Sequence, residues 1–228
     1  MLKLYIGNKN YSSWSMRAWV LMRQAGIDFD EIKLRFDSFS ADSNFKQRLG
    51  AISPAGKVPV LVDDGLVVWD TLAIAEYLAE RFPELHLWPR ETPARARARS
   101  VCAEMHSGFG ALRSACGMNI EAVLPEAGAI VWRDDAGVRA DVARLIEMWR
   151  ELLASYGGPM LFGRFSVADA FYAPVVMRLA TYALPVPDDI AAYMARVQAL
   201  PGMAAWVADA LAEHDFLPFE EGYRATPP

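Results

Sequence analysis

One stretch, Ser53–Leu61, constrains the fold more than any other part of the chain. Its two prolines and a glycine break regular structure, and the apolar run that follows predicts a short buried strand. A proline has no N–H for a sheet ladder, so Pro59 is expected at the start of that strand, at an edge or at a bulge. A cis bond before Pro59 would turn the backbone of Val58 away from the sheet and toward a ligand. Most X-Pro bonds are trans, so the residues alone leave both isomers open.

The residues that follow predict a turn, a second strand and a helix. An Asp-Asp-Gly sequence is typical of a hairpin turn, and Leu66–Trp69 predicts a short strand after it. Either Asp70 or Thr71 can cap the next helix, whose apolar residues recur at helical spacing. The segment from residue 53 to residue 78 therefore predicts a loop, two strands joined by a turn, and a capped helix.

The N-terminal residues predict a strand, a helix and a second strand, which together form a βαβ unit. The helix begins near Ser12 and Ser13 and ends at Gly26, a residue type that commonly follows a helix. Serine is one of the best helix caps and contributes about 1 kcal/mol there. Capping is thus the structural interpretation of the two serines.

The same two serines, Ser12 and Ser13, also have a functional interpretation. A hydroxyl at a helix N-terminus can donate a hydrogen bond to a thiolate, and the helix dipole there favours an anion. Both effects lower the pKa of a thiol, and the thiolate is the nucleophilic form. One serine can cap the helix while the other points at a ligand, so both interpretations stay open.

The combined pattern resembles the glutathione transferases. Their thioredoxin-like domain typically carries S/N-P-x-G-K/Q-V-P-x-L, followed by an acidic residue and a hydroxyl residue that open a helix. Here Ser53–Leu61, Asp70 and Thr71 complete that pattern. The resemblance implies that Pro59 follows a cis bond and that the backbone of Val58 pairs with the cysteinyl part of glutathione. It also implies that Asp70 and Thr71 hold the γ-glutamyl end.

The start of the first helix resembles one class within that family. Ser12–Arg17 is similar to the zeta-class signature S-S-C-S-x-R. By this resemblance Ser12 is the lead candidate for activating glutathione, and Ser13 is the second. Trp14 stands where the signature has a cysteine, which argues against zeta-type maleylacetoacetate isomerisation but not against the transferase fold.

Four further residues near this site have alternative interpretations. Other transferase classes use a tyrosine near the end of the first strand, so Tyr11 is an alternative activator, whereas Tyr5 is expected in the core. In the family, the region after the second strand lies over the glycine end of glutathione. Lys46 or Lys57 could therefore pair with the glycine carboxylate, or both could be ordinary solvated lysines.

The rest of the chain predicts helices only, because strong helix formers dominate and no alternating strand pattern recurs. We expect one long helix over residues 91–115, a loop-rich connection over 116–135 and a second long helix over 136–156. Ser166 and Asp169 form a capping box that the family also has, at the start of its buried core helix.

The fold class expected from these features is α/β plus all-α, the glutathione transferase fold. The predicted division is a thioredoxin-like domain over residues 1–82, a linker over 83–90 and an all-helical domain over 91–228.

Composition limits the other classes of function. The net charge of −5 argues against a nucleic-acid binder. The sequence has no apolar run long enough to span a membrane, and its three His and two Cys are too scattered to predict a metal cluster. The two cysteines suit a reducing compartment, and the chain enters a strand at once without a signal-peptide pattern, so we expect a cytoplasmic protein.

The resemblance implies a glutathione transferase that works in detoxification. Glutathione would be the cosubstrate, without a metal, and would bind the first domain. A hydrophobic electrophile would lie against the second domain, and the protein would form a homodimer. Two alternatives stay open: a glutathione-dependent isomerase or reductase, and a non-catalytic glutathione-binding or stress-regulatory module.

Overall fold

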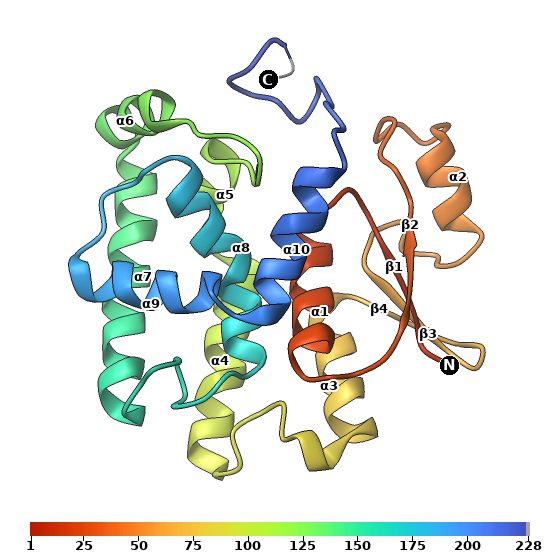
Figure 1. The fold of residues 1–228 in the computed structure, drawn as a ribbon, viewed down its shortest axis with the longest axis horizontal. Helices are drawn as coiled ribbons and strands as arrows, with labels where there is room; N and C mark the ends of the chain where they lie inside the picture. The colour runs from red at the N-terminus through yellow and green to blue at the C-terminus, as the bar shows by residue number, and fades with distance from the viewer. Residues whose placement is uncertain (227–228) are drawn as a thin grey trace.

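The computed structural model describes residues 1–226. A four-stranded sheet lies on one side of the molecule and a group of helices on the other, as Figure 1 shows. This arrangement confirms the predicted fold class of an α/β domain followed by an all-helical domain. The boundary itself, placed at residues 83–90, stays a prediction; the structure has the short 3-10 helix η1 (Pro83–Leu85) there.

The sheet is mixed, with its strands in the order β2-β1-β3-β4. The strands are β1 (Lys3–Ile6), β2 (Asp30–Lys33), β3 (Val60–Asp63) and β4 (Leu66–Trp69). The outer strand β2 runs parallel to β1, while β1 with β3 and β3 with β4 are antiparallel pairs. Strand β3 begins directly after Pro59, as the sequence predicts, so this proline needs no N–H for the ladder.

Three helices accompany the sheet: α1 (Ser13–Gln24), α2 (Asn44–Gly50) and α3 (Thr71–Arg81). Helices α1 and α3 lie between the sheet and the helical domain, whereas α2 lies on the far side of the sheet (Figure 1). The middle of α1 is buried without interruption from Ser15 to Met22. Helix α1 is therefore enclosed by both domains.

Up to residue 226, the second domain contains seven helices, and α8 is its core. They are α4 (Thr92–Ser107), α5 (Gly110–Ala115), α6 (Pro125–Asp134), α7 (Ala136–Tyr156), α8 (Val167–Thr181), α9 (Asp188–Gln198) and α10 (Pro201–Ala212). All but one residue of α8 are buried, and this helix packs against α1 of the first domain. The domain contact is thus formed by two helices that are buried along most of their length.

Two predicted segments differ from the structure. The helix expected over residues 91–115 is two helices, because Gly108 and Phe109 interrupt it. A Cβ at Gly108 would lie 2.7 Å from the carbonyl oxygen of Glu104, and Phe109 has a φ of 55°. The connection expected over 116–135 contains α6, which starts at Pro125 because proline suits the first turn of a helix.

Helix α10 is joined to the loop that precedes α1 through Lys9. The buried Lys9 ammonium lies 2.7 Å from Glu31 and 2.5 Å from Asp209, with its Nζ 4.4 Å from the centre of the Trp19 ring. The indole N–H of Trp206 also donates to the carbonyl oxygen of Lys9 at 3.0 Å. The C-terminal helix therefore fixes the segment that leads into α1.

Within residues 1–226, none of the helices combines the length and the apolar character that crossing a membrane requires.

The capping box of α8 yields a prediction about stability. The fully buried carboxylate of Asp169 accepts hydrogen bonds from the backbone N–H groups of Leu161 and Ser166 and from the hydroxyls of Ser166 and Tyr193. Asp169→Ala leaves these donors unpaired, so it should lower the free energy of unfolding by about 3 kcal/mol or more in urea denaturation. Asp188→Ala, at an exposed residue of α9, is the matched control and should change it far less. Equal effects would contradict this role of Asp169.

Candidate functional site

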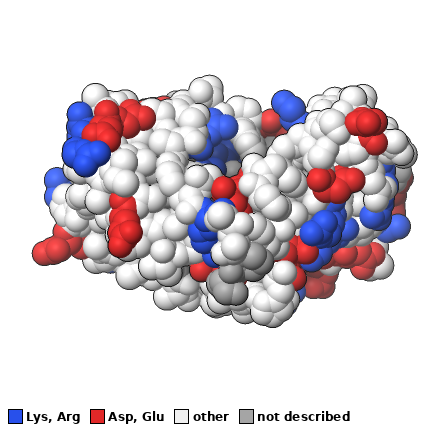
Figure 2. Space-filling model, turned by 90° about the horizontal axis from the view of Figure 1, so that it is seen from above, with Lys and Arg blue, Asp and Glu red and all other residues white. Residues whose placement is uncertain are grey.

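A cavity of about 630 Å³ opens between the sheet domain and the helical domain. Figure 2 shows a hollow between the two halves of the molecule, with Lys and Arg atoms inside it. Every residue that the sequence predicts at the site lines this cavity: Ser12, Ser13, Lys46, Lys57, Val58, Pro59, Asp70 and Thr71. The fold thus gathers three separate segments, the start of α1, the region from α2 to β3, and the start of α3, around one space.

The Val58–Pro59 bond is cis, the isomer that the resemblance implies. Neither the N–H nor the C=O of Val58 hydrogen-bonds to another residue in 1–226. Both backbone groups are therefore free to pair with a bound molecule that has peptide-like donors and acceptors.

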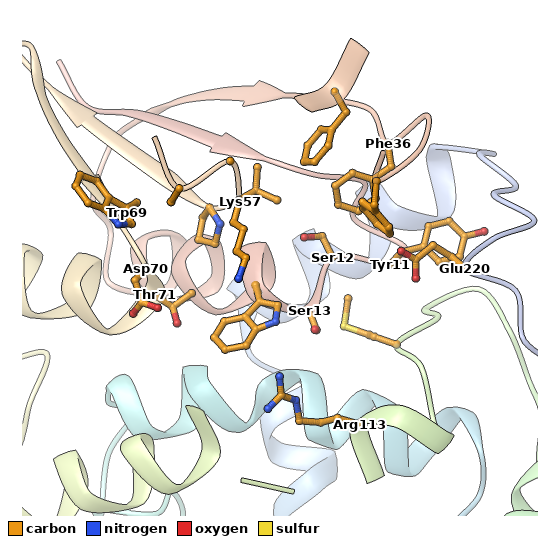
Figure 3. Close-up of a pocket in the computed structure, with 18 of the residues that line it drawn as sticks. Tyr11, Ser12, Ser13, Phe36, Lys57, Trp69, Asp70, Thr71, Arg113 and Glu220 are labelled. Carbon is orange, nitrogen blue, oxygen red and sulfur yellow. The ribbon is translucent and has the colours of Figure 1, made fainter. Parts of the chain in front are cut away.

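The start of α3 places a carboxylate beside a hydroxyl at one end of the cavity (Figure 3). Asp70 caps the helix, accepting from the backbone N–H of Leu72 at 2.8 Å, and its other oxygen lies 3.4 Å from Nε2 of His106. Its φ of 74° is unusual for a residue other than glycine, a conformation that costs about 1–3 kcal/mol and is common at functional sites. The buried hydroxyl of Thr71 has no partner among the described residues.

The two serines differ in their hydrogen bonds. The Ser12 hydroxyl donates to Oγ of Ser15 at 2.7 Å and weakly caps α1, accepting from the backbone N–H of Ser15 at 3.4 Å. The Ser13 hydroxyl accepts a bond from Nη2 of Arg178 at 3.2 Å, and within residues 1–226 it donates none. The proton of the Ser13 hydroxyl is therefore free, whereas that of Ser12 is engaged.

Tyr11 does not present a free hydroxyl to the cavity. Its phenolic O–H donates to a carboxylate oxygen of Glu221 at 2.7 Å. Burial, followed by this hydrogen bond, raises the pKa of Tyr11 to about 12. Tyr5 lies in β1 and packs against a second apolar cluster, which agrees with its expected structural role. The hydroxyl proton of Tyr11 is thus not available in the way that that of Ser13 is, and Tyr5 is not among the residues that line the cavity.

The two lysines also differ. The Lys46 ammonium donates to the carbonyl oxygen of Gly56 at 2.7 Å and so supports the loop before β3. Lys57 extends into the cavity, as Figure 3 shows, and its ammonium makes no hydrogen bond or ion pair with the residues in 1–226. Lys57 is therefore better placed than Lys46 to meet an anionic group of a ligand.

The opposite wall comes from the helical domain and includes residues that the sequence did not single out as site residues. Arg113 of α5 and Arg178 of α8 line the cavity, with Met118 and Glu220. The centre of the Trp14 ring lies 4.4 Å from the guanidinium carbon of Arg17 and 5.2 Å from that of Arg113. Only the packing of α1 against the helical domain brings these residues together, so no local pattern could have identified them.

Two arginines, Arg113 and Arg178, bring positive charge to this wall, and the buried Arg17 of α1 packs against Trp14 nearby. In the part of the chain that the structure describes, no carboxylate lies within ion-pair distance of Arg17, Arg113 or Arg178. Burial, followed by the charge of Arg113, lowers the pKa of Arg17 to about 9 and that of Arg178 to about 10. Both remain charged at neutral pH, so this side of the cavity favours negative charge.

Comparison with known proteins identifies the family. The family model for the N-terminal domain of glutathione S-transferases matches residues 11–81, and the model for the C-terminal domain matches residues 94–209. The chain belongs to the glutathione transferase family. These two matches cover the sheet domain from residue 11 onward, without β1, and most of the helical domain described above.

Individual glutathione transferase relatives are distant. A protein described as a probable maleylacetoacetate isomerase of Caenorhabditis elegans is 32% identical over 111 residues, 49% of each chain. Glutathione S-transferase Z1 of Arabidopsis thaliana is 39% identical over 95 residues, 39% of this chain and 40% of that protein. The chain thus spans half or less of the length of these two relatives.

Solved structures of the family share the fold. A glutathione transferase homologue from Burkholderia with bound glutathione has a TM-score of 0.70 at 24% identity, covering 92% of this chain and 98% of that one. A glutathione transferase from Methylococcus capsulatus has a TM-score of 0.67 at 25% identity, covering 93% and 100%. The two-domain fold is thus common to these proteins.

The unpaired hydroxyl of Thr71 leads to a prediction about the ligand-free protein. Thr71→Val removes a buried hydroxyl that has no partner, so it should leave the free energy of unfolding unchanged or raise it slightly. Thr181→Val is the matched control, because the Thr181 hydroxyl donates to the carbonyl oxygen of Asn119 at 2.9 Å. That substitution should cost about 1 kcal/mol in urea denaturation. A larger loss at Thr71 than at Thr181 would mean that the Thr71 hydroxyl serves stability.

Proposed function

We propose that this protein is a glutathione transferase that activates the thiol of glutathione through a serine hydroxyl. The observation that carries the proposal is the convergence of unpaired polar groups on one cavity. These groups are the backbone of Val58, the hydroxyl of Thr71 and the hydroxyl proton of Ser13. The Thr71 hydroxyl is buried, where an unpaired polar group is costly, and a ligand with matching polar groups would pair it together with the half-buried groups of Val58 and Ser13.

The shape and charge of glutathione suit this arrangement. The carboxylate of Asp70 would pair with the ammonium of the γ-glutamyl residue, and the Thr71 hydroxyl would bind its carboxylate at the N-terminus of α3. The backbone of Val58 would pair with the cysteinyl residue beside Pro59. Lys57 would meet the glycine carboxylate, since Lys46 already supports Gly56.

The proposed mechanism is the attack of a thiolate on an electrophilic carbon. A serine hydroxyl at the start of α1 donates to the sulfur, and the helix dipole adds to its stabilisation. The sulfur then forms a bond to the acceptor, and the leaving group departs with its electron pair. The free proton of the Ser13 hydroxyl favours Ser13 over Ser12 as the donor.

The wall formed by the helical domain would receive the acceptor. Met118 of this wall and Trp14 of α1 offer apolar contact for a hydrophobic electrophile, and the guanidinium of Arg113 adds a positive charge beside Trp14. A homodimer, a cytoplasmic location and a role in detoxification stay predictions of the family resemblance.

A glutathione-dependent isomerase is the second candidate, and the names of several relatives favour it. Trp14, in place of the cysteine of the zeta-class signature, argues against it. An isomerase returns glutathione unchanged, a transferase consumes one thiol for each product, and a reductase oxidises glutathione. The number of thiols lost per product therefore distinguishes these activities.

The role of Asp70 can be tested without disturbing the helix. Asp70→Asn removes the negative charge but keeps a side chain that caps helices well. Loss of a charge-assisted contact with the ligand's ammonium should weaken glutathione binding about 10–100-fold in titration calorimetry. Asp64→Asn, in the exposed turn between β3 and β4, is the control and should leave the affinity unchanged. An unaltered affinity in Asp70→Asn would remove Asp70 from the proposed site.

The two serines can be separated by the ultraviolet absorbance of the thiolate, titrated against pH with glutathione bound. Ser13→Ala should raise the pKa of the bound thiol by about one unit or more and change the affinity little. Ser12→Ala should leave that pKa nearly unchanged and lower the free energy of unfolding by about 1 kcal/mol, because Ser12 caps α1.

The opposite pattern would assign activation to Ser12. Binding of glutathione to the wild-type protein without any thiolate absorbance would contradict a catalytic role and favour the non-catalytic module.

A further inference from the structure

Arg178 connects the most buried helix of the second domain to the serines of the first. It lies on α8, which packs directly against α1, and only 7% of the residue is exposed. Its Nη2 atom lies 3.2 Å from Oγ of Ser13. The hydroxyl favoured above as the thiol activator is thus held by a residue from the other domain.

The guanidinium of Arg178 is fixed in place by further contacts. Its Nη1 atom donates to the carbonyl oxygen of Cys116 and, at 3.4 Å, to that of Arg113. No carboxylate in residues 1–226 lies within ion-pair distance, although Glu220 lines the same cavity beyond that range. Arg178 therefore presents a full positive charge, in a rigid orientation, to the oxygen of Ser13.

A hydroxyl that accepts a bond from a cation becomes a better donor. Hydrogen bonds arranged in sequence polarise one another, and bonds to charged groups are the stronger ones. Because the Ser13 oxygen accepts from Arg178, its proton is directed away from the guanidinium. Ser12 has no such cationic partner, since its bonds are to Ser15.

We propose that Arg178 is a positioning residue that orients and polarises the Ser13 hydroxyl toward the sulfur of glutathione. This inference rests on the proposed function, because it needs glutathione as the ligand. It assigns the acidity of the bound thiol in part to a residue of the second domain that does not itself touch the sulfur.

A double-mutant cycle tests the proposal, with the pKa of bound glutathione measured by thiolate absorbance as the readout. Ser13→Ala and Arg178→Met should each raise this pKa by about one unit, as expected when a donor to a thiolate is lost. If Arg178 acts through Ser13, the double variant should show no more than the larger single effect. A purely structural role of Arg178 would lower stability without this coupling.

Two further variants separate position from charge. Arg178→Lys keeps a positive charge, but one compact ammonium cannot bond to both Cys116 and Ser13. This variant should therefore raise the pKa of bound glutathione by less than Arg178→Met does. In a protein that already carries Ser13→Ala, Arg178→Lys should not raise this pKa further. Arg113→Met removes a nearby charge that makes no bond to Ser13 and should shift the pKa much less than Arg178→Met. The lysine variant keeps the test decisive if Arg178→Met fails to fold.

Several outcomes would overturn the inference. If the rise in thiol pKa in the double variant equals the sum of the two single rises, Arg178 acts independently of Ser13. Equal shifts in Arg113→Met and Arg178→Met would mean that only the general positive field matters. If Ser12→Ala raises the pKa of bound glutathione and Ser13→Ala does not, Arg178 cannot act through Ser13. The transferase proposal would still stand in that case. Absence of any thiolate in the wild-type complex would instead defeat the proposed function itself.

Discussion

The enclosure of α1 between the two domains is the constraint on which the rest of this structure depends. Eight consecutive residues, Ser15–Met22, are buried, so this part of the helix is enclosed on every side. Its position is set by the sheet on one side and by α8 and α10 on the other. Because the helix cannot shift, its polar N-terminus has one location, at the cavity between the domains. Ser12, which precedes α1, and Ser13, which begins it, are therefore fixed in position by the packing of the apolar residues further along the helix.

The parts of the site that the sequence predicts are those encoded in short segments. The Ser53–Leu61 pattern and the Asp70-Thr71 pair each determine their own backbone, through a proline that starts a strand and an acid that caps a helix. The arginine wall was not predictable in this way. Arg113 and Arg178 lie on different helices and approach Trp14 and Ser13 only after both domains have packed. Spacing along the chain contains no information on such contacts.

The errors in the predicted helices have a similar origin. Helix-forming composition extends across residues 91–115, and the interruption is a local change of backbone conformation, with Gly108 extended and Phe109 at a positive φ. At Pro125 the opposite error occurred, because a proline that ends one helix can equally occupy the first turn of the next. Local propensity predicts that a segment is helical more reliably than it predicts where the helix is broken.

Charged groups of both signs line the cavity. Asp70 lies beside the first residue of α3 and Arg113 on the wall opposite (Figure 3). Arg178 also lines the wall of the helical domain, where Glu220 adds a carboxylate. A ligand with an ammonium near Asp70 and a developing negative charge near the two arginines would place each charge beside its opposite in a space of reduced solvent. In the proposed function, the first domain would supply the contacts that recognise such a ligand. The second would supply positive charge near its reactive centre, so a complete site would require both domains in the arrangement that α1 and α8 fix.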